Sequence, residues 1–291
     1  MTYASGPPTP PPYQGGPPAV CVRHPDRATG LTCTRCERPA CTECLREASV
    51  GYQCVDCVGA TARTGRRGTT VAGAEPGRRP VVVPALIAIN FAVFAVTALQ
   101  AGDLMRNDRS SVFVDGMLVP LLVADGDWWR LITSGFLHFG VIHVLVNMLA
   151  LWLLGRDLEV VLGRSRFVAV YMLALLGGSV AGLLFSTRDV PLVGASGAVF
   201  GLMGGLLVVM RRLRIPPGQV IGLIALNVAL SLVITNISLV AHLGGLVVGA
   251  AATAAMVYAP PRNRTAVQVS AVVGLTLLLA AVAATTVAVG F

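Results

Sequence analysis

The sequence contains no lysine, and its last acidic residue is Asp189. Only 12% of the 291 residues are charged and 55% are hydrophobic, with the apolar residues gathered into long runs after Val81. So little charge excludes a soluble globular protein for this part of the chain, because runs of about 20 apolar residues are long enough to cross a bilayer as helices. The sequence therefore predicts an all-α polytopic membrane protein.

Seven apolar segments are long enough to be membrane spans, and their positions relative to arginine predict the topology. Arginine supplies all 22 positive charges and is most frequent before the first span and after the second, fourth and sixth. The positive-inside rule then predicts a multi-pass protein, of the plasma membrane, with a cytoplasmic N-terminus and a C-terminus outside. The expected spans are residues 81–100, 132–154, 167–185, 193–210, 220–234, 239–258 and 267–287.

Composition also divides the chain into parts. Residues 1–19 hold seven of the 18 prolines and no apolar run, which predicts a disordered tail rather than a cleavable signal peptide. Residues 59–80 are rich in Gly, Arg and Thr and are expected to link a cysteine-containing segment to a transmembrane domain at 81–291. The net charge of +8 is explained by the arginines that set the predicted topology. The sequence shows no face with interleaved basic and aromatic residues that would indicate nucleic-acid binding.

All seven cysteines precede residue 58, where they form, with one histidine, three C-x2-C pairs and one C-x2-H pair. Eight ligands of these types are the number that two tetrahedral zinc ions require. A disulfide framework is the alternative, but the number of cysteines is odd and the predicted cytoplasmic side is reducing. We therefore predict a two-zinc module at residues 20–58, with ligands Cys21, His24, Cys33, Cys36, Cys41, Cys44, Cys54 and Cys57.

The spacing leaves the ligand pairing open. In an interleaved arrangement Cys21 and His24 share one ion with Cys41 and Cys44, whereas in a sequential arrangement the first pair joins the second. The opening C-x2-H resembles a B-box-type zinc finger, although the later histidines usual in that module are absent. If all eight residues are ligands, no coordination position stays open for catalysis. We therefore expect structural zinc and a cytoplasmic protein partner for this module.

Two residues in the apolar segments have the side chains that a serine hydrolase uses as nucleophile and general base. Ser196 lies in Gly-Ala-Ser-Gly and His242 in Ala-His-Leu-Gly-Gly, in different expected spans. Close helix packing ordinarily explains a serine among glycines, but an ionisable residue at membrane depth indicates function. At 1.5 Å per residue, Ser196 lies about 22 Å and His242 about 24 Å above the cytoplasmic ends of their spans. The two side chains are therefore expected at one level, where the imidazole can act as general base.

Two further residues are predicted to stabilise an oxyanion. His143 and Asn147 lie one turn apart in the second expected span, about 20 Å and 14 Å up by the same count. With the backbone N–H of Ser196 they could donate hydrogen bonds to a tetrahedral intermediate. No acidic residue follows Asp189, and earlier ones lie in loops or at the cytoplasmic end of the second span. We therefore predict a Ser-His dyad, with the imidazole oriented by packing against Phe200.

These residues resemble the motifs of the rhomboid intramembrane serine proteases. Residues 194–197 match the family's G-x-S-G, and His242 begins a match to H-x2-G-x3-G. The run from His143 to Asn147 matches H-x3-N, and the Trp-Arg pair at 129–130 matches the W-R of the first external loop. The resemblance covers approximately residues 80–290.

The resemblance implies a six-helix rhomboid-like core, to which this chain adds a seventh C-terminal helix and the zinc module. It also implies cleavage of transmembrane protein substrates in the lipid bilayer, near its outer face, with no cofactor for catalysis. His138 matches a position that supports loop and water structure in the family. Phe200 departs from the tyrosine that many members carry there.

Other functions fit the sequence less well. A zinc metalloprotease would need H-E-x-x-H, whereas His138 and His143 are separated by four residues without a nearby glutamate. A transporter would be expected to show an inverted repeat or paired broken helices, which this sequence lacks. A catalytically silent rhomboid-like scaffold or binding protein is the remaining alternative, although such homologues typically lack the serine or the histidine.

Overall fold

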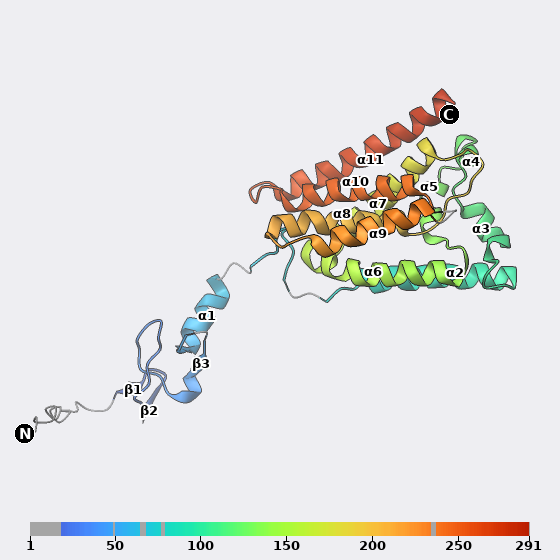
Figure 1. Ribbon diagram of the computed structural model, residues 1–291. Helices are drawn as coiled ribbons and strands as arrows, with labels where there is room; N and C mark the ends of the chain where they lie inside the picture. Colours follow the sequence, from blue (N-terminus) through green and yellow to red (C-terminus); the bar gives the residue numbers. More distant parts are fainter. Residues whose placement is uncertain (1–18, 49, 65–67, 77–78, 234–236, 291) are drawn as a thin grey trace, which may run out of the picture. The chain divides into compact units, whose positions relative to one another are not determined.

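The computed structural model describes residues 19–48, 50–64, 68–76, 79–233 and 237–290 (Figure 1). The chain forms two compact units, Met1–Arg67 and Gly68–Phe291. The tail expected at 1–19 lies outside the described residues except for Ala19.

The first unit is a small module in which cysteines make up most of the core. Its only apolar buried side chains besides cysteine, among the residues described, are Ala40 and Leu45. So small a core supplies little stability, which is typical of modules that fold around metal. In order it contains β1 (Val20–Cys21) paired antiparallel with β2 (His24–Ala28), η1 (Thr42–Cys44), β3 (Leu45–Glu47) paired antiparallel with β4 (Tyr52–Cys54), and α1 (Val55–Thr64).

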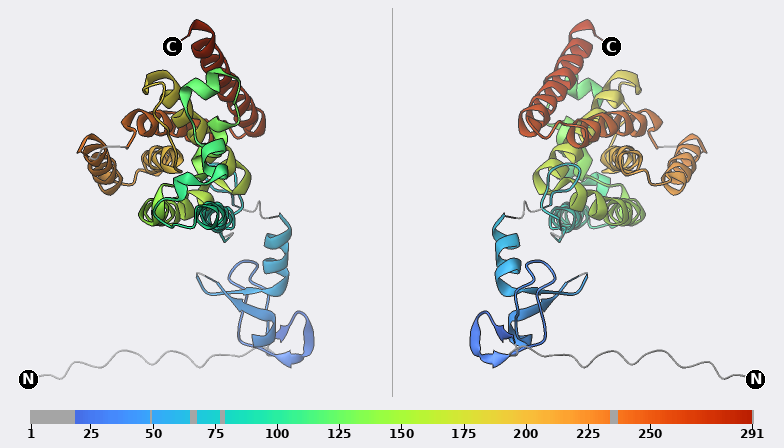
Figure 2. Two further views of the ribbon diagram at one scale, coloured as in Figure 1. Left: turned by 90° about the vertical axis from the view of Figure 1, so that its right-hand side faces the viewer. Right: turned by 90° about the vertical axis from the view of Figure 1, so that its left-hand side faces the viewer.

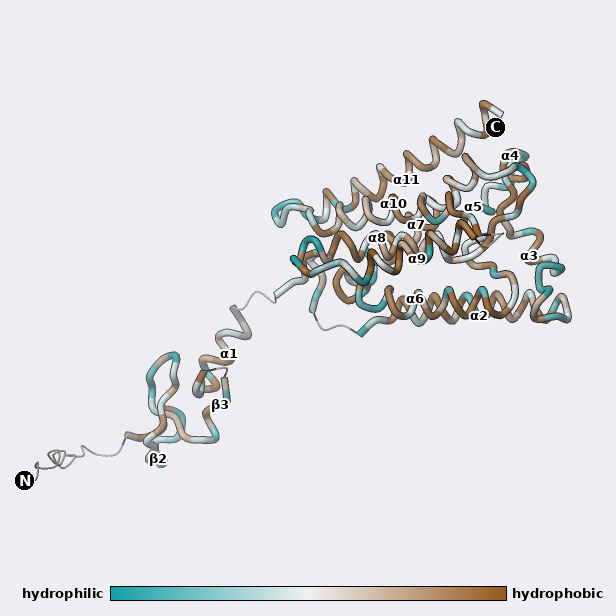
Figure 3. Tube along the Cα trace, in the orientation of Figure 1, coloured by the Kyte–Doolittle hydropathy of each residue, from teal (hydrophilic) through white to brown (hydrophobic). Residues whose placement is uncertain are grey.

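The second unit is all-α, and in its described part six helices are long and apolar enough to span a membrane. The chain is an integral multi-pass membrane protein, and apolar residues dominate these helices (Figure 3). The six are α2 (Val82–Ala101), α6 (Gly140–Leu162), α7 (Arg164–Phe185), α8 (Ser196–Leu213), α10 (Leu239–Val257) and α11 (Arg264–Val289). The shorter α9 (Gly218–Val233) corresponds to the fifth expected span.

The second expected span has different bounds in the structure. It was expected at 132–154, but α6 begins at Gly140 and runs to Leu162. The preceding loop instead folds into η2 (Asn107–Arg109), α3 (Ser111–Gly116), α4 (Pro120–Ala124), α5 (Arg130–Thr133) and η3 (Ser134–Phe136). Gly140 has φ +66°, a left-handed conformation that separates η3 from α6. The apolar run is thus interrupted by backbone geometry that hydropathy does not reveal.

Glycines let α10 approach α8 closely. A Cβ added to Gly245 would lie 2.0 Å from the carbonyl oxygen of Gly197, and one added to Gly249 would lie 2.4 Å from that of Gly201. Only glycine lets the backbones of α8 and α10 come this close. Such close approach at small residues is expected between membrane helices. Figure 2 shows α11 at the periphery of the helical unit, in agreement with its largely exposed surface.

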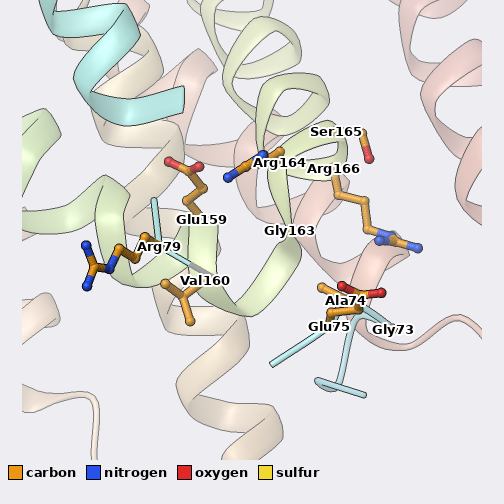
Figure 4. A pocket seen from close by; sticks show the side chains of 10 residues that line it. All are labelled: Gly73, Ala74, Glu75, Arg79, Glu159, Val160, Gly163, Arg164, Ser165 and Arg166. Atoms are coloured by element: carbon orange, nitrogen blue, oxygen red, sulfur yellow. The ribbon is translucent and has the colours of Figure 1, made fainter. Parts of the chain in front are cut away.

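Residues 70–76 and 79–83 pack against one end of the helical unit. The buried carboxylate of Glu159 accepts hydrogen bonds from the backbone N–H groups of residues 81–83 at 2.7–2.9 Å, where α2 begins. The Ala72 side chain is fully buried, and its carbonyl accepts a hydrogen bond from Gln268 of α11. A cavity of about 330 Å³ beside the turn between α6 and α7 is lined by both acidic and arginine side chains (Figure 4). The range expected as a linker, 59–80, therefore includes part of α1 and residues packed on this unit.

Candidate active site

Ser196 and His242 are hydrogen-bonded to each other in the structure. Ser196 is the first residue of α8, and its Oγ lies 2.9 Å from Nε2 of His242 in α10. The close packing of these helices positions both residues, because Gly197 follows the serine and Gly245 lies one turn after the histidine. The Phe200 ring stacks on the imidazole with centroids 4.1 Å apart and planes inclined by 13°. This stacking is the packing contact that the sequence analysis expected.

The second nitrogen of His242 has a partner that the sequence analysis did not identify. The hydroxyl oxygen of Ser231, in α9, lies 3.0 Å from Nδ1 of His242, and both side chains are buried. Within the described residues, no acidic side chain hydrogen-bonds to the imidazole. Asn227 and Ser231, four residues apart in an otherwise apolar span, form a polar stripe that could have been noticed in the sequence.

His143 directs an N–H group toward the space beside Ser196. The backbone N–H of Phe139 donates to Nδ1 of His143 at 3.3 Å, so in the neutral ring Nε2 carries the proton. A Cβ placed on Gly194 would lie 2.8 Å from this Nε2 and 3.8 Å from Oγ of Ser196. Gly194, with φ +121°, therefore leaves open the region between the imidazole and the hydroxyl.

Asn147 lies one turn below His143, and its side chain lines the same cavity. It is 6% exposed, and its Nδ2 donates to the carbonyl oxygen of His143 at 3.0 Å. An amide nitrogen carries two protons, so this bond leaves one available to a ligand. The structure thus brings all four site residues expected from the sequence to one cavity.

His138 supports the residue before the serine, and Arg130 supports the loop that precedes α6. The buried His138 accepts a hydrogen bond at Nε2 from the backbone N–H of Ala195 at 3.4 Å. Arg130 is also buried; its guanidinium donates to the carbonyl oxygens of Val114 and Met117 and to the carboxylate of Asp127. These contacts stabilise the loops around the site and do not reach the Ser196 hydroxyl.

A cavity of about 820 Å³ contains the hydrogen-bonded pair. Its polar side chains include those of Ser196, His242, His143, Asn147 and Ser231. Leucine, valine and phenylalanine side chains from α6, α8 and α9 and from the loops make up most of the remaining wall. A hydroxyl and a base in such surroundings are suited to an extended apolar peptide rather than to a small charged ligand.

The eight expected metal ligands gather into two groups of four. Cys21, His24, Cys41 and Cys44 form one group, and the other four cysteines form the second, as in the interleaved arrangement. The ligand atoms in each group lie within 4.8 Å of one another. The backbone N–H of Cys54 donates to Sγ of Cys33 at 3.2 Å and lowers the pKa of that thiol to about 6. A thiolate stabilised in this way fits a zinc ligand, because zinc binds the deprotonated sulfur.

Part of the chain is similar to known proteins. The model of the rhomboid domain matches residues 125–259, which include Ser196, His242, His143 and Asn147. The chain contains a rhomboid domain. Helices α2 and α11 and the cysteine-containing unit of this chain lie outside the matched range.

Several named rhomboid proteins are similar in sequence. The rhomboid protease GluP of Bacillus subtilis is 34% identical over 61% of this chain and 35% of its own length. The putative rhomboid protease YdcA of the same organism is 40% identical over 43% of this chain and 65% of its own length. The rhomboid protease AarA of Providencia stuartii is 25% identical over 66% of this chain and 78% of its own length. The chain thus spans between about a third and two thirds of the two Bacillus relatives.

Proposed function

We propose that this protein is an intramembrane serine endopeptidase of the rhomboid family that cleaves transmembrane segments of other membrane proteins. The observation that carries the proposal is the 2.9 Å separation between Oγ of Ser196 and Nε2 of His242 inside a cavity with largely apolar walls. Similarity to named rhomboid proteases supports the same reaction class. Serine hydrolases use this pair of atoms for nucleophile and general base.

In the proposed mechanism Ser196 Oγ attacks the carbonyl carbon of the scissile peptide bond. Its proton passes to Nε2 of His242, and the resulting imidazolium returns that proton to the leaving amine when the C–N bond breaks. A water molecule that gives its proton to His242 then attacks the acyl carbon, the bond from that carbon to Ser196 Oγ breaks, and the imidazolium returns the proton to Oγ. Neither acylation nor deacylation requires a metal or a cofactor, because the His242 imidazole accepts and returns the proton in each.

The developing oxyanion would occupy the space that Gly194 leaves open. Nε2–H of His143 borders this space, and the backbone N–H of Ser196 starts a helix, where it has no intrahelical acceptor. The unused proton of the Asn147 amide would supply a third donor after a small side-chain rotation. The first two donors are already in place and are effective because they need no reorganisation during the reaction.

The topology and the metal module complete the proposal. The arginine distribution favours an N-terminal unit in the cytoplasm. We further propose a location in the plasma membrane, with cleavage near the outer face. We propose that the two groups of four ligands in that unit each hold a structural zinc ion. Because the ions would have four protein ligands each, this module would contact a cytoplasmic protein partner rather than take part in hydrolysis.

The decisive experiment is cleavage of a single-span substrate in liposomes by the purified full-length protein. We expect the wild type to cleave it and to react with a fluorophosphonate probe at Ser196. Ser196→Ala and His242→Ala should each abolish turnover, with the double variant no worse than either, because members of one catalytic unit are not additive. A folded wild type that neither cleaves nor reacts with the probe would favour the silent-scaffold alternative.

A further inference from the structure

Ser231 links α9 to the imidazole of His242. Across α9, all of which the structure describes, Ser231 is the one buried residue, with 8% exposure. Its Oγ lies 3.0 Å from Nδ1 of His242 and 2.8 Å from the backbone carbonyl oxygen of Asn227, one turn earlier. The hydroxyl therefore has two neighbours but only one proton to donate.

The carbonyl group of Asn227 decides which way that proton points. A carbonyl oxygen can only accept, so the bond to Asn227 requires Ser231 to be the donor. The Ser231 oxygen must then accept from His242, which places a proton on Nδ1. In the neutral imidazole this leaves Nε2 with a lone pair facing the Ser196 hydroxyl at 2.9 Å, as a general base requires.

The stacking of Phe200 on His242 does not select the tautomer of the imidazole. Stacking at 4.1 Å restrains the plane of the ring, but it does not distinguish the two ring nitrogens or the two tautomers. In the opposite tautomer Nε2 would carry the proton and could not accept one from Ser196. A hydrogen bond at Nδ1 is therefore the contact that selects the reactive form, a role that a carboxylate fills in many serine hydrolases.

We propose that Ser231 is a positioning residue that holds His242 in the tautomer with Nδ1 protonated and Nε2 free to accept the Ser196 proton. This inference rests on the proposed protease function. Ser231 would join Ser196 and His242 as an uncharged third residue, and it donates its own hydroxyl proton to the backbone carbonyl oxygen of Asn227. Because the residue acts through His242, its loss should lower kcat and leave KM nearly unchanged.

The test compares Ser231→Thr with Ser231→Val in the liposome assay. These side chains have nearly the same shape, but only threonine keeps a hydroxyl that can bond to the carbonyl four residues earlier. One neutral hydrogen bond corresponds to a change of about 3- to 10-fold. We therefore expect kcat to fall by that factor in Ser231→Val and Ser231→Ala, to stay near wild type in Ser231→Thr, and KM to be unaffected in all three.

Thr276→Ala is the matched control. It removes a hydroxyl that donates to its own i−4 carbonyl in α11, on an exposed face, and should leave kcat unchanged. Thermal unfolding of each variant in detergent separates loss of fold from loss of rate. Equal kcat for the Thr and Val variants, or a change in KM alone, would overturn the role of Ser231 while the wild type still cleaves. A wild type without cleavage would instead overturn the protease function, and this inference with it.

Discussion

Replacing Gly245 by alanine tests whether the α8–α10 contact sets the catalytic geometry. The new Cβ would lie 2.0 Å from the carbonyl oxygen of Gly197, whereas real Cβ contacts are essentially never shorter than 3.0 Å. The helices must therefore separate locally by about 1 Å. Gly197 follows Ser196, and Gly245 lies one turn from His242. Separating the two helices here should therefore lengthen the 2.9 Å hydrogen bond between Ser196 and His242.

The expected result is a large loss of rate with a smaller loss of stability. A displacement of about 1 Å between reacting groups costs about 10²-fold in rate. Overpacking costs about 1–3 kcal/mol of folding free energy, offset by about 1 kcal/mol because alanine favours helix over glycine. We therefore expect kcat in liposomes to fall about 10²-fold, while thermal unfolding in detergent shows a folded protein.

Gly274→Ala provides the control for the intrinsic effect of the substitution. Gly274 also lies within a helix, but a Cβ there would meet no atom within 4 Å. This variant should keep the wild-type rate and be equally or slightly more stable. If Gly245→Ala cleaved as fast as Gly274→Ala, the argument that glycine packing holds the dyad together would be refuted.

Four other experiments have defined outcomes. Asn147→Ala should lower kcat by up to about 10²- to 10³-fold with little change in KM, as for an oxyanion donor, and an unchanged kcat would reduce the residue to packing. Glu159→Gln keeps one acceptor oxygen but replaces the other by an NH2 group, which cannot accept from a backbone N–H, and calorimetry should show a loss of about 1–3 kcal/mol of stability. Deleting residues 1–67 should leave liposome cleavage intact, whereas deleting 1–75 should destabilise the helical unit by removing the buried Ala72. Metal analysis of the full-length protein should give two zinc ions per chain, fewer after Cys33→Ser, and one or none in the wild type would contradict the eight-ligand interpretation.

The sequence by itself determined the class of protein and the chemistry of the candidate site. Apolar runs specify membrane helices because each backbone polar group must be satisfied within its own segment, so the length of a run approximates the length of a helix. The resemblance to the rhomboid family followed from four short motifs, each of which lies within a few residues of sequence. The C-x2-C and C-x2-H pairs likewise indicate metal ligands locally, and their number implies two ions.

Tertiary structure decided what depends on contacts between distant segments. The interleaved grouping of cysteines, the start of α6 at Gly140 and the packing of Ala72 against α11 could not be obtained from hydropathy. The contact between Ser231 and His242 is the clearest case. It requires α9 and α10 to present these residues to each other, and that depends on the rotation of each helix about its axis. Close glycine contacts fix the position of α10 against α8, and no single segment encodes that arrangement.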